Sequence, residues 1–227
     1  MRLGLLAAVL LALTGLQANA QELKSEDDKT VYALGLSLGR TIKIFDLSPA
    51  EIEIVKKGMT DALTGATPAV DLEQYGRRLT PLANSRQERA GQKFLETTAK
   101  EKGATKLPSG VVYKELKAGT GASPKASDKV RVHYRGTLIN GTEFDSSYKG
   151  DPVEFGLTQV IQCWTEGVQK MKVGGKAQLV CPAKTGYGAA GSPPRIPSNA
   201  TLVFDIELLG IDGQGADVPR ADPQPKK

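Results

Sequence analysis

The sequence predicts an α+β fold, with a helical N-terminal half and a C-terminal antiparallel sheet wrapped around one short helix. Apolar residues recur every three or four positions from residue 27 to about residue 103, which is the period of an α-helix. After Pro108 the period changes to two, as in a β-strand. The dipeptide Asn140-Gly141, between two alternating segments, is typical of a β-hairpin turn.

The first twenty residues have the features of a secretory signal peptide. Met1 and Arg2 give a short positive start, residues 3–16 are apolar, and Ala18-Asn19-Ala20 is a small-x-small cleavage site. The alternative is an anchor that stays attached, but the apolar run is short for a membrane span. We therefore predict a signal peptide over residues 1–20 and an exported protein.

Three short helices are predicted within residues 21–83, the first on the stripe Val31, Leu34, Leu38 and Ile42. The second follows Ser48-Pro49-Ala50-Glu51, which supplies an N-cap, a proline in the first turn and the Glu of a capping box, and Gly65 is placed to end it. The third starts at Asp71, and Pro81 is expected to kink or interrupt it. Because narrow stripes give a thin core, we expect these helices to form a homodimer.

Residues 84–104 are predicted to form a linker helix. The segment is rich in Arg, Gln, Glu, Lys and Ala, and its only large apolar residues are Phe94 and Leu95. A helix this polar is either a solvated bridge between domains or partly disordered. We favour the bridge, because no residue disfavours a helix more than Gly91 until Gly103.

Residues 105–211 are predicted to form the sheet domain. Alternating or β-branched runs predict strands over residues 111–116, 129–139, 176–181 and 201–209, and residues 165–171 are predicted to form the one short helix. Residues 212–227 contain Gly, Asp, Pro, Gln and Lys with few apolar residues, so we expect a disordered tail.

Composition argues against several functions. One histidine and two cysteines cannot build an ordinary zinc or iron site, and His133 has no recognisable nucleophile beside it, so we expect no metal, no cofactor and no hydrolase chemistry. The formal net charge is +5, but the 30 basic residues are interspersed with 25 acidic ones, which argues against nucleic-acid binding. His133 is interpreted as an ordinary strand residue.

Cys163 and Cys181 are the only cysteines in the chain. In an oxidising compartment an even pair favours a disulfide, and closing a loop of this length stabilises by about 3 kcal/mol. Two small buried thiols are the alternative.

Aromatic and branched residues in the C-terminal half predict a dry, ring-lined pocket. Tyr134 and Phe204 fall on the apolar faces of their strands, and Trp164 opens the short helix directly after Val160-Ile161. Tyr187 and Asp145 would supply polar groups at the edge. Each aromatic residue taken singly is equally explained as core, as we interpret Phe155, Leu202 and Ile206. Such a pocket suits binding and twisting an amide rather than cleaving one.

Taken together, these motifs resemble the FK506-binding-protein family of peptidyl-prolyl cis–trans isomerases from about residue 110 to residue 211. Residues 27–103 resemble the helical dimerisation region of its bacterial macrophage-infectivity-potentiator subgroup. The strings that carry the resemblance are Val132-His133-Tyr134-Arg135-Gly136, Phe144-Asp145-Ser146-Ser147, Val160-Ile161-Gln162-Cys163-Trp164-Thr165-Glu166-Gly167, Tyr187-Gly188 and residues 200–209.

The resemblance implies a prolyl isomerase with an indole floor at Trp164. Tyr187 would donate its hydroxyl to a substrate carbonyl, the backbone N–H of Ile161 would bind another, and Asp145 would lie near the twisting amide. The residues expected to carry catalysis are Tyr134, Phe144, Asp145, Tyr187 and Phe204. Those expected to bind substrate are Val153, Val160, Ile161, Trp164 and Ile196.

The resemblance also implies partners and a location. Expected partners are unfolded or partly folded polypeptides that contain proline, with FK506 or rapamycin-type macrolides as inhibitors. We favour the periplasm, with an outer-membrane-associated or secreted location as the alternatives. Folding-chaperone activity is expected beside the isomerase; the rival reading is a chaperone whose pocket serves only for docking.

The sequence departs from the family pattern at three positions. Lys149 stands in a short loop, Tyr148-Lys149-Gly150-Asp151, where an arginine often pairs with the aspartate, and an ammonium cannot form the guanidinium fork. Val153 occupies a place where some members have an aromatic wall, and Arg195 stands where a smaller or apolar residue is commoner. We expect these departures to affect substrate preference and macrolide affinity rather than the reaction.

Overall fold

The computed structural model describes residues 23–212. The predicted signal peptide and all but the first residue of the predicted tail lie outside the described residues. The chain divides into two units, one ending at Thr41 and one starting at Ile42.

The first unit consists of most of α1 (Glu26–Ile42), whose first turn holds Glu26, Asp27 and Asp28. These carboxylates favour the positive end of the helix dipole. No residue of α1 is buried, and Val31 of the predicted apolar stripe is 67% exposed. The stripe is therefore present in α1, but its residues are not buried.

The second unit begins with the 3₁₀ helix η1 (Lys43–Phe45) and α2 (Pro49–Thr64). The predicted capping box of α2 is present, because the Ser48 side chain accepts from the Glu51 N–H while the Glu51 carboxylate accepts from the Ser48 N–H. The helix ends at the predicted position, since Gly65 adopts a left-handed conformation with φ of 72°. Short-range capping signals thus predicted this helix well.

The helix predicted to start at Asp71 and to be kinked or interrupted at Pro81 does start there, and it is interrupted at residues 77–78, before the proline. The structure has two helices there, α3 (Leu72–Gly76), capped by the Asp71 side chain, and α4 (Leu79–Thr98). Pro81 lies in the first turn of α4, where its missing N–H would have had no partner within the helix. The break therefore precedes the proline, which lies in the first turn of the second helix.

The predicted linker helix is present as α4, and contacts hold it both to the helices before it and to the sheet domain. Near its start, Arg86 donates to both Glu51 carboxylate oxygens, at 2.5 and 3.2 Å, and to the Phe45 carbonyl at 2.9 Å. Near its end, Leu95 is buried, and a Cβ built at Gly91 would lie 2.2 Å from Thr201 Oγ1. The absence of a side chain at Gly91 therefore allows α4 to approach the sheet domain closely.

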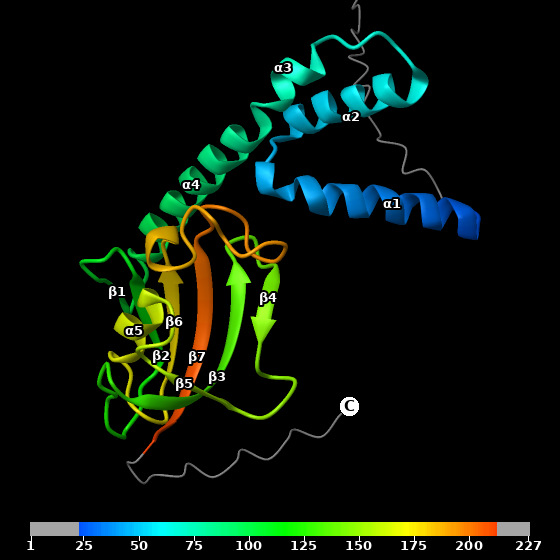
Figure 1. The fold of residues 1–227 in the computed structure, drawn as a ribbon. Coiled ribbons are helices and arrows are strands. Elements are labelled where there is room, and N and C mark those ends of the chain that lie inside the picture. Colours follow the sequence, from blue (N-terminus) through cyan, green and yellow to red (C-terminus); the bar gives the residue numbers. More distant parts are fainter. Residues whose placement is uncertain (1–22, 213–227) are drawn as a thin grey trace, which may run out of the picture. The chain divides into compact units, whose positions relative to one another are not determined.

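Seven strands form one antiparallel sheet in the order β1-β2-β6-β7-β3-β4, with β5 also pairing with β3 (Figure 1). This confirms the predicted α+β fold. Four strands lie close to the predicted ranges, whereas the other three have three or four residues each and are too short to show alternation. The strands are β1 (Ala104–Lys106), β2 (Val112–Lys117), β3 (Lys129–Leu138), β4 (Glu143–Ser146), β5 (Val153–Gly156), β6 (Lys176–Cys181) and β7 (Leu202–Ile211).

The hairpin between β3 and β4 has the predicted position but a different backbone. Gly141 has φ of 79°, whereas Asn140 does not have a positive φ, so this is not the turn in which both central residues do. The Asn140 side chain instead accepts from the Thr142 N–H at 3.0 Å.

The sheet has a different partner on each face. One face packs against α5 (Gln162–Val168), which begins three residues before the predicted helix, so that Trp164 lies inside it. The close approach needs Gly167, where a Cβ would lie 2.5 Å from Leu179. The other face carries a second cluster, in which Leu95 of α4 packs with Val112, Val180 and Val203. Residues of opposite parity on β6 and β7 therefore fill separate cores.

Candidate active site

A cavity of about 350 Å³ opens between α5 and the strands that face it. Its lining comes from β3, β4, β5, β7, α5 and the segments before α5 and after η2 (Ala183–Thr185). The lining residues are Tyr134, Phe144, Asp145, Phe155, Gln159, Val160, Ile161, Trp164, Tyr187 and Phe204.

Trp164 lines this cavity and is only 4% exposed. Three rings meet its indole edge-on, with centroid distances of 5.2 Å to Tyr134, 5.5 Å to Phe155 and 5.4 Å to Phe204. Phe144 packs on Phe204 in the same way, at 5.5 Å. Edge-to-face contacts of this kind fix the orientation of each ring as well as burying it.

A glycine on β3 makes room for the aromatic wall. A Cβ at Gly136 would lie 2.6 Å from the Phe144 ring and 3.0 Å from the Phe204 ring. Any other residue at position 136 would displace at least one of the two rings.

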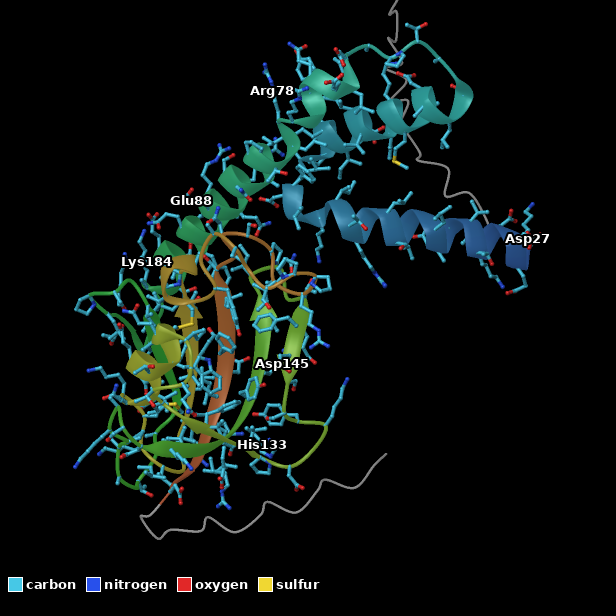
Figure 2. All side chains as sticks on the ribbon, in the orientation of Figure 1. Asp27, Arg78, Glu88, His133, Asp145 and Lys184 are labelled. Atoms are coloured by element: carbon cyan, nitrogen blue, oxygen red, sulfur yellow. A yellow bond between two sulfur atoms is a disulfide. The ribbon has the colours of Figure 1, made fainter. Side chains whose placement is uncertain are left out.

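The polar groups of the cavity lie at its edge. Tyr134 donates its hydroxyl to Asp145 Oδ2 at 2.5 Å, and the other carboxylate oxygen accepts from the Ser146 N–H at 3.0 Å. Burial raises the pKa of the Tyr134 hydroxyl above its ordinary value, and the hydrogen bond to Asp145 raises it further. This hydroxyl is therefore a permanent donor that holds the Asp145 carboxylate (labelled in Figure 2) in place.

Two further donors face the cavity without a partner in the described part of the chain. The Tyr187 side chain is exposed and its hydroxyl makes no hydrogen bond among the described residues. The Ile161 N–H, just before the first residue of α5, makes none there either. A ligand with two carbonyl oxygens would satisfy both groups.

The structure brings together all but two of the predicted site residues. Val153, on β5, pairs with Val132 of β3 and does not line the cavity. Ile196 is buried in the core and likewise does not line it. The aromatic wall at this side is Phe155, two residues after Val153, which sequence reasoning assigned to the core. Gln159 was also missed, since nothing in its local sequence indicates a cavity.

The other two departures from the family pattern, Arg195 and Lys149, have different surroundings. Arg195 donates to the Phe144 carbonyl at 3.4 Å, so its guanidinium contacts the backbone of β4. In the structure Lys149 makes no salt bridge with Asp145, and Asp145 is instead held by Tyr134.

His133 (Figure 2) lies outside the cavity. Its ring stacks on Tyr148 at 5.0 Å, and its Nδ1 lies 3.0 Å from Ser147 Oγ. Ser147 Oγ in turn accepts from the Tyr134 N–H at 2.8 Å. The histidine thus supports the turn that follows β4, in agreement with the interpretation as a strand residue.

Cys163 and Cys181 form a disulfide in the structure, with a Cα–Cα distance of 5.6 Å. Both residues are fully buried. The bond ties α5 to the end of β6 directly beside Trp164, so it restrains the helix that carries the indole.

Residues 23–212 contain no group of three or more His, Cys, Asp or Glu side chains that could hold a metal ion. Within the same range no helix has the length and apolar character needed to cross a membrane. What the cavity offers is a largely apolar volume with ample room for a prolyl ring, with a carboxylate and two free donors at its edge. Such a site can bind an amide, remove it from water and hold it on both sides.

Comparisons with known proteins agree with this geometry. A family profile described as "FKBP-type peptidyl-prolyl cis-trans isomerase" matches residues 121–209, and one described as "Domain amino terminal to FKBP-type peptidyl-prolyl isomerase" matches residues 27–114. The chain is similar to the FKBP-type peptidyl-prolyl cis-trans isomerase FkpA of Aeromonas hydrophila, with 40% identity over 221 residues that cover 88% of this chain and 82% of the relative.

Two further likenesses extend over most of the chain. The outer membrane protein MIP of Legionella longbeachae is 36% identical over 210 residues, which cover 85% of this chain and 89% of the relative. The crystal structure of FkpA from Escherichia coli aligns with a TM-score of 0.55 and 38% identity, covering 84% of this chain and 98% of that one.

Proposed function

Because this chain belongs to the FKBP-type peptidyl-prolyl cis–trans isomerases, we propose that it isomerises Xaa-Pro bonds of exported proteins in the cavity above Trp164. The observation that carries the proposal is the indole with three rings edge-on around it, at the base of a cavity with free donors at its edge. The family membership confirms the resemblance found in the sequence. The catalytic and substrate-binding roles of individual residues are part of the proposal.

The physical task is to lower a rotation barrier of about 18–20 kcal/mol about a bond with partial double-bond character. A planar amide is more polar, through its resonance, than the twisted transition state. Moving the amide from water into an apolar cavity therefore stabilises the twisted form relative to the planar one, which is catalysis by differential binding. This step needs no covalent intermediate and no cofactor.

We assign roles to the lining residues on this basis. The prolyl ring packs on Trp164 between the rings of Tyr134, Phe144 and Phe204, and Phe155 takes the wall position predicted for Val153. The Tyr187 hydroxyl and the Ile161 N–H bind the two carbonyl oxygens that flank the proline. Asp145, held by Tyr134, lies beside the rotating amide.

The test uses Phe144→Tyr and Asp145→Leu in a protease-coupled assay on an Xaa-Pro tetrapeptide. We expect each substitution to lower kcat/KM by about tenfold or more, because each disturbs contacts made to the twisted amide. Tyr148→Phe, outside the cavity, is the matched control. Unchanged rates in both cavity variants would remove the site assignment.

Macrolide binding is tested by titrating the protein with FK506 or rapamycin and recording tryptophan fluorescence. Trp164 is the only tryptophan of the chain, so the signal reports on the floor of the cavity. We expect a saturable change, which Phe144→Tyr weakens.

We also propose that the protein acts outside the cytoplasm, with the periplasm as the favoured compartment. Support comes from the signal-like residues 1–20, from a disulfide between buried cysteines, which suits an oxidising compartment, and from the name of the Legionella longbeachae relative. Uncatalysed Xaa-Pro isomerisation takes tens to hundreds of seconds, which is slow for folding there. Fractionation of the cells that produce the protein tests this location.

Chaperone activity and a homodimer are proposed for the helical half. Exposed apolar side chains on α1, α2 and α3 support both, with Leu63 as much as 85% exposed. A fragment of residues 21–83 that does not suppress aggregation of an unfolded client would contradict the chaperone proposal.

A further inference from the structure

A second cavity, of about 390 Å³, lies between α4 and two segments of the sheet domain. One wall is α4, through Glu88, Gln92 and Leu95. The opposite wall is the start of η2 and the residues after Tyr187, and the residues before β7 complete it. The lining from the sheet domain is Pro182, Ala183, Lys184, Gly188, Ala189, Asn199 and Thr201.

One hydroxyl of the lining, that of Thr201, opens on the cavity without a protein partner. Thr201 is only 5% exposed, lines the cavity, and makes no side-chain hydrogen bond to any described residue. Every fully buried side-chain nitrogen or oxygen of the described residues has a hydrogen-bond partner, so the Thr201 oxygen, which has none, is accessible from the cavity. The Thr201 hydroxyl therefore has hydrogen-bonding capacity that a ligand can use.

The other polar groups of the lining are suited to peptide groups. The Asn199 side chain has no hydrogen-bond partner among the described residues, and its amide offers both a donor and an acceptor. Gln92 donates its Nε2 to Glu96 Oε1 at 2.8 Å, which leaves its own carbonyl oxygen able to accept. Amide side chains pair with the N–H and C=O groups of an extended polypeptide in the way that two peptide groups pair with one another.

The charges of the lining argue against an anionic ligand. Glu88 on α4 and Lys184 on η2, both labelled in Figure 2, stand on opposite walls, and neither forms a salt bridge with a described residue. With one charge of each sign the cavity gives no net attraction to a phosphate or a nucleic acid. The small residues Ala183, Gly188 and Ala189 leave the facing wall open to a main chain.

The two cavities share a wall. Tyr187 lines the prolyl cavity, and the next two residues, Gly188 and Ala189, line the second one. This wall is held by backbone hydrogen bonds from Gly188 N–H to the Ala183 carbonyl at 2.8 Å and from Asn199 N–H to the Gly188 carbonyl at 3.1 Å. A chain that occupies one cavity thus has the other directly behind the Tyr187 loop.

We propose that the second cavity is a subsite that binds an extended main-chain segment of the client polypeptide, beside the prolyl cavity. The inference rests on the proposed function, because it assigns to the same clients a second point of contact. It predicts that a long substrate gains from contacts that a tetrapeptide does not reach.

Two substitutions in the full-length protein test the subsite. Thr201→Val removes the hydroxyl and keeps the shape, and Asn199→Gly removes the amide while suiting the positive φ of 56°. We expect each to lower kcat/KM on a refolding protein limited by prolyl isomerisation by about three- to tenfold, the effect of losing one or two hydrogen bonds. The tetrapeptide kcat/KM should remain unchanged.

Two matched variants control for packing. Thr201→Ser keeps the hydroxyl and should retain wild-type rates on both substrates. Thr98→Val removes another buried hydroxyl of the same region, which does not line the cavity, and should also leave both rates unchanged. Equal losses on both substrates would assign Thr201 a structural role in the Tyr187 loop, and no loss on the long substrate would overturn the subsite.

A binding measurement separates this inference from the proposed function. Wild-type protein is titrated with a permanently unfolded polypeptide that lacks proline, and the side-chain amide NMR signals of Gln92 and Asn199 are followed. We expect both signals to shift, and binding to Thr201→Val to be weaker by the same three- to tenfold. Unshifted signals overturn the subsite even if the protein isomerises tetrapeptides, whereas an inactive protein whose signals shift overturns only the isomerase.

Discussion

The helices α1 to α3 and the sheet domain use apolar residues in opposite ways. None of these helices contains a buried residue, although their apolar stripes carry valine, leucine, isoleucine and methionine. The strands β3, β6 and β7 bury most of theirs within the same chain, on both faces of the sheet. Burying a leucine or valine contributes about 1.5–3 kcal/mol, so only the sheet domain obtains that stabilisation from its own chain.

The difference teaches that an apolar stripe shows which face of a helix will be covered but not by what. The stripe of α1 lacks a cover in the described chain, and a second copy is the cover that symmetry supplies most readily. The face of the sheet opposite α5 has its cover within the chain, in α4. Four predictions test or sharpen this contrast.

The largest expected effect is on oligomeric state. Replacing Leu34 and Leu38 of α1 together with aspartate puts two charges in the proposed dimer contact, and desolvating them would be costly. We expect the dimer to dissociate to monomers in sedimentation velocity, with the tetrapeptide kcat/KM unchanged. Ser37→Asp on the same helix is the control. A double variant that stays dimeric would place the interface elsewhere.

The next effect concerns the cover of the sheet. A fragment of residues 79–212 keeps α4, whereas a fragment of residues 105–212 leaves Val112, Val180 and Val203 uncovered. Each kcal/mol shifts the Tm of a domain of this size by about 4–8 °C, so we expect the shorter fragment to melt roughly 10 °C lower or more. Calorimetry of the two fragments measures this. Equal Tm values would mean that α4 contributes nothing to the sheet domain.

A single substitution sharpens the same point. Leu95→Ala in α4 should reduce the free energy of unfolding by about 2–5 kcal/mol, because it leaves a cavity in the second cluster. Leu63→Ala in α2, at an exposed position, should change it by less than about 0.5 kcal/mol. Urea unfolding of both in the monomeric aspartate background excludes any contribution of the dimer. Similar losses in the free energy of unfolding for the two variants would contradict the contrast between the exposed helices and the covered sheet.

The smallest effect lies in the contact between α2 and α4. The hydrogen bond from Arg86, followed by those from Ser48, lowers the pKa of Glu51 to about 2 from its ordinary value of 4.5. Because the folded pKa is lowered, this stabilisation is complete above about pH 4.5 and is lost as the pH falls through about 2.

Glu51→Gln should therefore flatten the decline of the urea midpoint between about pH 4.5 and about pH 2. Glu53→Gln on the same helix, which removes an exposed ion pair with Lys56, is the control and should keep the wild-type decline. If the two variants decline alike, the Arg86 contact does not carry the acid sensitivity.

Local signals predicted most of the elements. The capping box at Ser48, the stop at Gly65 and the alternation along β3, β6 and β7 act over a few residues, and the structure contains them where the sequence indicates. The short strands β1, β4 and β5 were not predicted, because segments of three or four residues form strands only when a neighbouring strand is already in place. The start of α5 was misplaced because Ile161 carries no capping side chain.

The candidate site was predicted in large part through strand parity and family resemblance. Tyr134 and Phe204 share the face that parity assigns, and Trp164, Asp145 and Tyr187 join them in one cavity. Val153 and Phe155 show the limit, since both have the same parity on β5 and only the closure of the sheet on α5 decides which one reaches the indole. Ile196, in the segment between η2 and β7, is buried in the core.

By itself the sequence determined the class of fold, the caps of α2, the faces of the long strands and the family, because each depends on neighbours within a turn or a strand or on an ordered set of motifs. The tertiary structure alone decided that α4 covers a face of the sheet, that Phe155 completes the aromatic wall and that Thr201 opens on a second cavity. These features depend on contacts between residues far apart in the chain. A single glycine such as Gly91 sets how closely α4 approaches the sheet domain, and no local sequence pattern predicts that distance.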